Sequence, residues 1–346
     1  MVIVRPVAMS DLEPLLELAG LAGAGLTTLP RDAALLKKRI DKSLKSFAAE
    51  PDKPGGESYL FIMEDLSAKR VIGACGIVSK VGGFEPFYSY RIDKVLFESK
   101  AIKVRKEVPI LVLAAEHDGP CEVGSLFLHP DYRGGGNGRL LQLVRFLFIA
   151  ERPECFESTV VSELRGVLDE KDRSPFWDAL GRHFFGIDFG EADRLSIVNK
   201  KFIAELMPKH PIYIPLLPRD AQEVIGKPHK EGVRAVKNLQ EEGFAISDMV
   251  DIFDAGPVMS CARDEIRTIK MSRRVKIAAV TDQPINSACF LLGTTRTDFR
   301  ATKGPLDVNG PEGVRITGET AAALRVHVGD MIRIVEARPT GGTAGS

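Results

Sequence analysis

One stretch, residues 122–150, combines a strand, a glycine-rich loop and an apolar helix. It reads Glu122-Val-Gly-Ser-Leu-Phe-Leu-His129, then Pro130-Asp-Tyr-Arg-Gly-Gly-Gly-Asn-Gly138, then Arg139-Leu-Leu-Gln-Leu-Val-Arg-Phe-Leu-Phe-Ile-Ala150. Glycines allow a sharp turn and a close approach of a ligand to the backbone. The first turn of the helix offers unpaired N–H groups and the positive end of the helix dipole. The stretch therefore predicts a phosphate or pyrophosphate site; the alternative is an ordinary glycine-rich turn that caps a buried helix.

The loop has the spacing Arg133-x-x-Gly136-x-Gly138, which resembles the pyrophosphate loop of the GCN5-related acyltransferases. No Lys-Ser/Thr pair follows the last glycine, as a nucleoside-triphosphate loop would require. The dinucleotide pattern Gly-x-Gly-x-x-Gly with a later acidic residue is also missing. The resemblance implies an acyl-coenzyme A site formed by Arg133, Gly134, Gly135, Gly136, Asn137 and Gly138. For Arg133, a solvated loop cation is the alternative interpretation.

The composition is that of an ordinary soluble protein. The chain has 346 residues, 27% of them charged, with 47 Lys+Arg balancing 47 Asp+Glu. No excess of positive charge is available for nucleic acid. No apolar run could span a bilayer and no signal peptide is visible, so we expect no membrane partner and a cytoplasmic location. The five cysteines are scattered, which indicates free thiols and no metal site or disulfide framework.

The order of patterns predicts an α+β fold, a GCN5-related acyltransferase-like mixed sheet flanked by helices. Residues 58–63 and 70–78 read as an antiparallel hairpin, and residues 82–119 as an elaborated meander. From about residue 260, short β-rich runs alternate with turn residues, including two strands around a Gly-Asp turn at residues 325–335. We therefore predict an acyltransferase-like domain with insertions over 1–259, a small all-β, barrel-like domain over 260–340, and a disordered tail over 341–346.

Several blocks along the chain together resemble the bacterial arginine N-succinyltransferase family. The blocks are Gly25-Leu-Thr-Thr-Leu-Pro30, Ser125-Leu-Phe-Leu-His-Pro-Asp-Tyr-Arg133 with Gly136-Asn-Gly138, Glu163-Leu-Arg-Gly166, Ser174-Pro-Phe-Trp177, Phe202-Ile-Ala-Glu-Leu-Met-Pro-Lys-His-Pro-Ile-Tyr213, Val224-Ile-Gly226 with His229, and Asp251-Ile-Phe-Asp-Ala-Gly-Pro257. The long block that ends at Tyr213 is more specific than the glycine loop.

The resemblance implies transfer of succinyl from succinyl-CoA to the α-amine of L-arginine, the first step of arginine degradation to glutamate. The amine attacks the thioester directly, succinyl-CoA is a co-substrate, and no cofactor is tightly bound. L-Ornithine remains open as a second acceptor, because some members are paired α and β subunits that act on arginine and ornithine. The resemblance also implies a homo-oligomer or a hetero-oligomer with a paralogous subunit. By position it makes Leu126 a backbone contact of succinyl-CoA and His229 the proton donor to the leaving thiolate.

The acceptor site is predicted from chemistry. A guanidinium substrate needs a carboxylate partner, and Glu163 is the first candidate and Glu122 the second. Either could instead be a buried structural carboxylate paired with Arg165 or another cation. Thr27 and Thr28 lie in the loop that borders the acceptor pocket in this fold class, with capping of the next helix as the alternative.

Two further functions stay open. The chain could be a non-catalytic acyltransferase-like subunit that binds and supports a paralogous catalytic partner, although its complete glycine loop and His229 speak for an enzyme. It could also be an acetyltransferase that modifies protein lysines. Succinyl requires a cation near its carboxylate, and no single Arg or Lys can be assigned to that task from the sequence, nor can the general base.

Overall fold

The computed structural model describes residues 1–22, 28–49, 51–198, 200–310 and 313–338, and Thr27 therefore lies outside the described residues. The strands are Val2–Pro6 (β1), Ser58–Asp65 (β2), Arg70–Val78 (β3), Gly82–Ser99 (β4), Val104–Asp118 (β5), Cys121–Leu128 (β6), Thr159–Glu163 (β7), Ile212–Tyr213 (β8), Ala245–Val250 (β9), Pro257–Ala262 (β10), Arg273–Thr281 (β11), Cys289–Thr294 (β12), Ala301–Gly310 (β13), Gly313–Thr317 (β14) and Met331–Glu336 (β15).

Helices lie between these strands. They are Leu12–Leu21 (α1), Ala33–Ala48 (α2), Asn137–Glu151 (α3), Pro175–Ala179 (α4), Gly181–Phe185 (α5), Phe189–Val198 (α6), Lys201–Leu206 (α7), Arg219–Val224 (α8), Val233–Glu241 (α9), Arg267–Met271 (α10) and Gly318–Leu324 (α11). None of the helices in the described ranges combines the length and the apolar composition that a membrane crossing needs.

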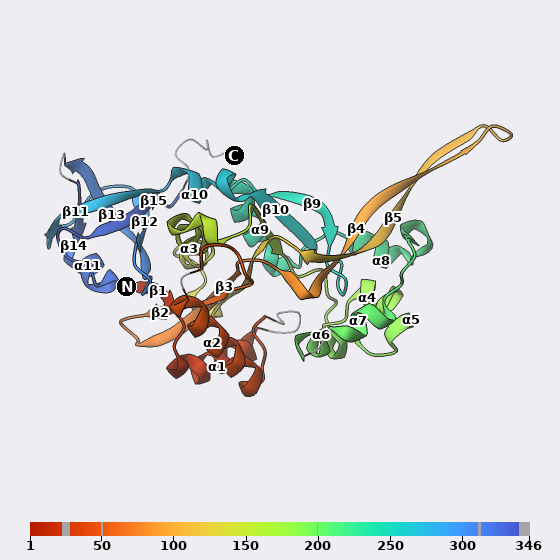
Figure 1. Ribbon diagram of the computed structural model, residues 1–346, viewed down its shortest axis with the longest axis horizontal. Coiled ribbons are helices and arrows are strands. Elements are labelled where there is room, and N and C mark those ends of the chain that lie inside the picture. The colour runs from red at the N-terminus through yellow and green to blue at the C-terminus, as the bar shows by residue number, and fades with distance from the viewer. Residues whose placement is uncertain (23–27, 50, 199, 311–312, 339–346) are drawn as a thin grey trace.

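A central sheet holds the body of the molecule together (Figure 1). Its strands follow the order β1-β2-β3-β6-β7-β10-β9-β4-β5-β8, antiparallel except for the parallel pair β6–β7. Side chains alternate between the two faces of a strand. In β2, Leu60 and Ile62 pack with α1 and α2, whereas Tyr59, Phe61 and Met63 pack with α3. The predicted mixed sheet flanked by helices is confirmed, as is the hairpin of β2 and β3.

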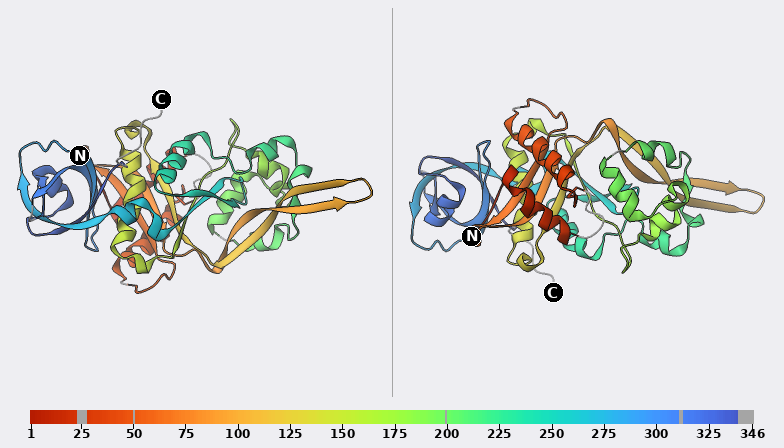
Figure 2. Two further views of the ribbon diagram at one scale, coloured as in Figure 1. Left: turned by 90° about the horizontal axis from the view of Figure 1, so that it is seen from above. Right: turned by 90° about the horizontal axis from the view of Figure 1, so that it is seen from below.

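The C-terminal strands form a closed ring, which lies beside β1 (Figure 2). The pairings run β12–β15–β11–β14–β13 and return from β13 to β12. The predicted β-rich, barrel-like unit is thus present, and it also contains α11, which the sequence analysis did not predict. Only β15 of the two strands expected in residues 325–335 exists. Arg325 ends α11 in a left-handed conformation (φ 58°) and residues 327–330 form a turn. The domain boundary at residue 260 stays a prediction.

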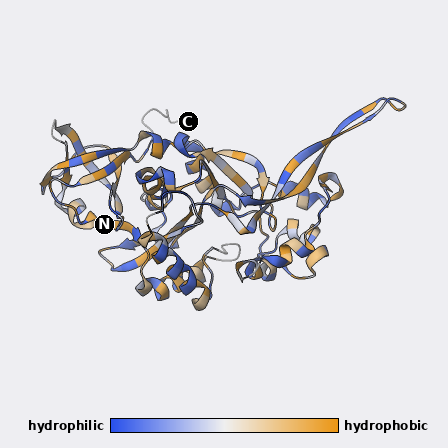
Figure 3. Ribbon diagram, viewed as in Figure 1, coloured by the Kyte–Doolittle hydropathy of each residue, from blue (hydrophilic) through white to orange (hydrophobic). Residues whose placement is uncertain are grey.

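Residues 82–118 form one long hairpin of β4 and β5, so the prediction of an elaborated meander was wrong. Pairing is continuous from Phe87↔Glu116 to Ser99↔Val104, and Figure 3 shows both hydrophobic and hydrophilic residues along the hairpin. The far end of the hairpin projects from the body, whereas its base packs with α4–α8 around Tyr90 and Trp177. This helical cluster borders the cavity described next.

Candidate active site

The parallel strands β6 and β7 separate after two paired residues, and this opens the sheet. Their register contains only Cys121↔Val160 and Glu122↔Val161. Beyond this point the β6 carbonyls accept hydrogen bonds from side chains and not from the backbone of β7. Ser162 Oγ donates to Val123 O at 3.1 Å, and Arg145 Nη1 donates to Gly124 O at 3.2 Å. An opening of this kind exposes a strand edge to which an extended ligand can add.

A bulge in β6 lies at the opening. The register with β3 passes from Gly76↔Gly124 to Ala74↔Phe127, so Ser125 and Leu126 together oppose a single residue. Ser125 is buried and has φ 55°, a left-handed conformation that costs a non-glycine residue roughly 1–2 kcal/mol. Bulges in strands redirect side chains and are frequent next to active sites. Leu126, the predicted coenzyme contact, therefore follows a strained residue at the point where the sheet divides.

The glycine loop turns from β6 into α3. Gly134, Gly135 and Gly136 all have positive φ (115°, 53° and 81°), which explains why three glycines stand in succession. Gly136 is the N-cap of the 15-residue helix α3. Lys303, from β13 of the C-terminal ring, donates to Gly135 O and, at 3.1 Å, to Asn137 Oδ1. The loop thus gains a cation from a residue far away in the sequence.

One cavity of about 1050 Å³ connects these features. Its lining includes most of the residues predicted for the site: Thr28, Glu122, Leu126, Arg133, Gly134, Gly136, Gly138, Glu163 and His229. Gly135 and Asn137 belong to the same loop. Arg133 is half-exposed and lies 3.6 Å from Glu231, which is compatible both with a coenzyme contact and with a solvated loop cation. Asp32, not Thr28, caps α2, by accepting from Leu35 N at 2.9 Å, so the capping alternative for Thr28 was wrong.

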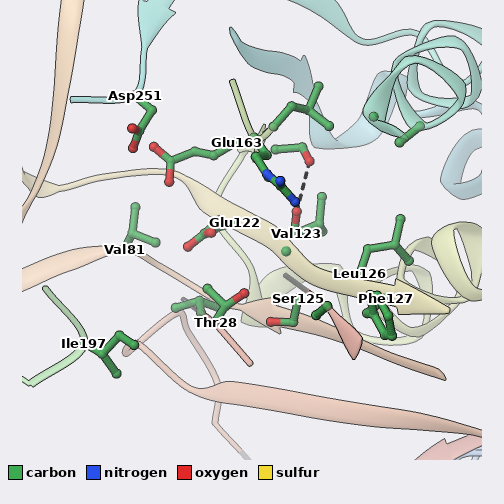
Figure 4. A pocket seen from close by; sticks show the side chains of 18 of the residues that line it. Thr28, Val81, Glu122, Val123, Ser125, Leu126, Phe127, Glu163, Ile197 and Asp251 are labelled. Carbon is green, nitrogen blue, oxygen red and sulfur yellow. Dashed lines mark hydrogen bonds between the residues drawn. The ribbon is translucent and has the colours of Figure 1, made fainter. Parts of the chain in front are cut away.

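Three carboxylates gather at one end of the cavity (Figure 4). Glu163 ends β7, Asp251 follows β9, and their carboxylates point toward one another, with Glu122 of β6 near them. The Oε1 atom of Glu163 is buried and makes no hydrogen bond within the described residues. Burial, followed by the charges of Asp251 and Glu122, raises the pKa of Glu163 well above its ordinary value. No ion pair joins Glu163 to Arg165 within the described residues; the nearest acidic partner of Arg165 is Asp172, at 3.8 Å.

Two arginines lie closer to the bulge. Arg145 of α3 is buried, and its guanidinium donates to Gln142 O and Gly124 O. Arg39 of α2 donates from Nη2 to Ser125 Oγ. Burial lowers the pKa of Arg39 to about 10, and the charge of Glu122 partly opposes this shift. Burial also raises the pKa of Glu122, against the charges of Lys200, Arg39 and Arg145.

His229 lies on the wall of the cavity next to the end of β7. Its backbone N–H donates to Arg165 O at 2.8 Å, and the preceding residue, Pro228, forms an isolated antiparallel β-bridge with Gly166. The ring atom Nδ1 accepts from Glu231 N at 3.3 Å, which leaves Nε2 as the ring atom that exchanges a proton. Burial, followed by the charge of Arg165, lowers the pKa of His229. The imidazole is therefore mostly neutral at pH 7.

Sequence reasoning missed Arg39, Lys303 and Asp251. Arg39 stands in the run Lys37-Lys38-Arg39, which reads as a solvated helix face, and Lys303 stands in a strand of another part of the chain. Asp251 opens one of the recognised blocks, and its position before a glycine-containing turn was the one local signal that could have identified it.

Comparisons with known proteins agree over the whole chain. The arginine N-succinyltransferase beta subunit family matches residues 2–268, and the C-terminal domain of the same beta subunit matches residues 273–336. An arginine N-succinyltransferase of Escherichia coli (strain 55989 / EAEC) is 41% identical over 339 residues, 97% of each chain. One from Shigella flexneri is 40% identical over the same share. The structure of arginine/ornithine succinyltransferase subunit AI from Pseudomonas aeruginosa superposes with a TM-score of 0.90 at 34% identity, covering 98% of this chain and 99% of that one.

The family match covers both the sheet with its cavity and the C-terminal ring, and the identity is high enough to settle descent. The chain belongs to the arginine N-succinyltransferase family.

Proposed function

We propose that this protein transfers a succinyl group from succinyl-CoA to the α-amine of L-arginine. The observation that carries the proposal is one cavity that joins a glycine loop, a divided strand pair, a histidine and three half-buried carboxylates. Each part matches one part of the two substrates. The acceptor could include L-ornithine as well, because one similar structure bears both names.

The coenzyme occupies the loop and the divided strands. Its pyrophosphate binds the N–H groups at the start of α3, where the positive dipole end and the cations of Arg133 and Lys303 stabilise negative charge. Its pantetheine amides pair with the exposed edge of β6, at Leu126 and the residues next to it. The thioester then lies beside the bulge.

The acceptor amine enters from the carboxylate end. Glu163, with its unpaired Oε1, binds the guanidinium, and Asp251 and Glu122 add negative charge around it. A guanidinium offers several N–H donors in one plane, which suits paired carboxylate oxygens. Thr28 also lines the cavity.

The α-amine attacks the thioester carbon once it has lost its extra proton. The C–N bond forms, the C–S bond breaks, the nitrogen releases one proton, and the departing thiolate takes one. The protonated imidazole of His229 gives its Nε2 proton to the sulfur and becomes neutral, and the proton that the nitrogen releases passes to solvent, from which the imidazole is protonated again before the next turnover. A histidine whose pKa is lowered by burial fits this exchange, because it holds the extra proton only briefly at neutral pH.

Thiol release from succinyl-CoA by the purified chain tests this function. We expect release that depends on L-arginine, slower release with acetyl-CoA, and a His229→Ala variant whose kcat falls about 100-fold or more while both KM values change little. His183→Ala, at an exposed histidine of α5, is the matched control. Release that His229→Ala leaves unchanged would remove this histidine from the mechanism. Release that needs an added paralogous subunit would favour the non-catalytic alternative.

A further inference from the structure

We propose that Arg39 binds the distal carboxylate of the succinyl group and so selects succinyl-CoA over thioesters of uncharged acyl groups. This inference rests on the proposed succinyl transfer and assigns the cation that such a transfer needs.

Arg39 is a half-buried cation for which the described residues supply no anionic partner. Its side chain reaches from α2 to β6, 86 residues later in the chain, and donates to the hydroxyl of Ser125. No carboxylate lies within ion-pair distance of its guanidinium in the described ranges, although Glu122 is near enough to affect its charge. A guanidinium has five N–H donors, and one hydroxyl leaves most of them available. A charge that is partly removed from water and has so little compensation is costly unless a ligand supplies the counter-charge.

One glycine, Gly76, keeps the space next to this guanidinium free. Gly76 of β3 and Gly124 of β6 oppose each other in the sheet. A Cβ on Gly76 would lie 3.2 Å from Arg39 Nη2 and 3.0 Å from Ser125 Oγ. Any side chain at this position would therefore displace the guanidinium or fill the space that a bound carboxylate would use.

The position of Arg39 fits the length of a succinyl group. Ser125 immediately precedes Leu126 and lies in the bulge, where the thioester is proposed to bind. Two methylene groups separate the succinyl carboxylate from the thioester carbon, so its binding group has to lie close to the bulge. The contact between Arg39 and Ser125 meets this condition.

Other groups already engage three further cations at or near the cavity: Arg145, Lys200 and Lys303. Arg145 donates to two backbone carbonyls. Lys303 binds the glycine loop, where the pyrophosphate is expected. The charge of Lys200 acts on Glu122 and Glu163 at the acceptor end.

Competition between two thioesters of equal length tests the proposal. Butyryl-CoA has a methyl group where succinyl-CoA has its carboxylate. We expect the wild-type protein to prefer succinyl-CoA strongly in kcat/KM with L-arginine. Arg39→Gln should reduce the ratio of succinyl to butyryl kcat/KM by about 100-fold, with a rise in KM for succinyl-CoA and little change for butyryl-CoA. Arg39→Lys should keep part of the preference, because it retains the charge but loses the planar pair of donors.

Controls separate selectivity from folding. Lys37→Gln removes one charge from the exposed face of the same helix and should leave the ratio unchanged. Inhibition by free coenzyme A, which lacks the acyl group, should be the same for wild type and Arg39→Gln if the loop is intact. A second variant, Gly76→Ala, keeps the guanidinium but crowds it, and should lower the same ratio about tenfold.

The outcomes distinguish this inference from the proposed function. A wild-type protein that transfers succinyl to arginine, together with an Arg39→Gln variant of unchanged ratio, overturns the role of Arg39 alone. A wild-type protein that transfers no acyl group to arginine overturns the proposed function as well. An equal loss of kcat/KM with succinyl-CoA and with butyryl-CoA would show that Arg39 supports the fold of the site and does not bind the carboxylate.

Discussion

The two ends of the cavity hold half-buried ionisable groups of opposite charge. Near the bulge, Arg39 meets a serine hydroxyl, whereas at the far end Glu163 lies among other carboxylates. Burial acts against charge at both ends, since it lowers the pKa of Arg39 and raises that of Glu163. The protein thus leaves each charge poorly compensated when the cavity is empty. In the substrates we propose, the acyl carboxylate would pair with Arg39 and the guanidinium of the acceptor would pair with Glu163. A ligand that lacks either charge would leave one of these two groups unpaired.

The largest effect is expected at the acceptor end. Glu163→Gln keeps the size of the side chain but removes its charge, so kcat/KM for L-arginine should fall about 100-fold. L-Citrulline has a neutral ureido group where arginine has its guanidinium, and the variant should discriminate far less between the two. The measurement is the ratio of the two kcat/KM values at saturating succinyl-CoA.

Glu154→Gln is a matched control, because Glu154 is exposed and lies outside the cavity lining. This variant should change kcat/KM neither for L-arginine nor for L-citrulline. Equal losses with arginine and citrulline would contradict a guanidinium contact. A loss of succinyl-over-butyryl preference in Glu163→Gln would show that the two ends of the cavity do not act separately.

A smaller effect is expected where the coenzyme loop meets the C-terminal ring. Lys303→Ala removes a cation that binds Gly135 O and Asn137 Oδ1. We expect KM for succinyl-CoA to rise about three- to tenfold, because a single partly exposed charge at a phosphate site contributes modestly. The preference for succinyl-CoA over butyryl-CoA and the preference for arginine over citrulline should both stay as in the wild type, because the loop lies outside the two ends of the cavity.

Lys276→Ala, at an exposed lysine of β11 in the same ring, is the control for Lys303→Ala. A falling kcat with an unchanged KM would place Lys303 in the chemical step and refute its assignment to the coenzyme.

The smallest expected effect is a gain in stability. The raised pKa of Glu163 means that folding favours its protonated form. The carboxyl group costs the folded state no stability below the pKa that it has in the unfolded chain. The cost of ionising it in the folded state develops as the pH rises through its higher folded-state pKa. Glu163→Gln should therefore raise Tm by about 1–2 °C at pH 8, where ~1 kcal/mol of repulsion is relieved, and by less at pH 5. Thermal unfolding at several pH values without substrate measures it. A lower Tm for the variant at pH 8 would mean that the carboxylate stabilises the empty fold.

Local sequence was sufficient for the strand, loop and helix of residues 122–150, because glycines and a long apolar run act within a few residues of each other. It was also sufficient to place Glu163 and His229 in one cavity, through blocks shared with a family. The sequence could not reveal Arg39, whose partner Ser125 lies 86 residues away, or Lys303, which lies 168 residues from Gly135. Such contacts depend on how distant segments pack, and a lysine–arginine run on a helix gives no sign of which side chain turns inward.

The same limit explains the differences in the fold. The long hairpin of β4 and β5 read as separate pieces because its polar residues, spaced along both strands, resemble turns. Residues 325–335 read as two strands because a Gly-Asp pair usually joins strands, yet Arg325 closes a helix there.

The pairing of β1 with β13 sets a condition on how the protein is made. Val4 pairs with Ala301, and Thr302 Oγ1 donates to Val2 O, so β1 waits for a partner strand that is translated about 300 residues later. At about 5–20 residues per second the delay is on the order of 15–60 seconds. During this time one edge of β1 is open to other nascent chains. Slow translation should therefore favour aggregation of this protein on ribosomes.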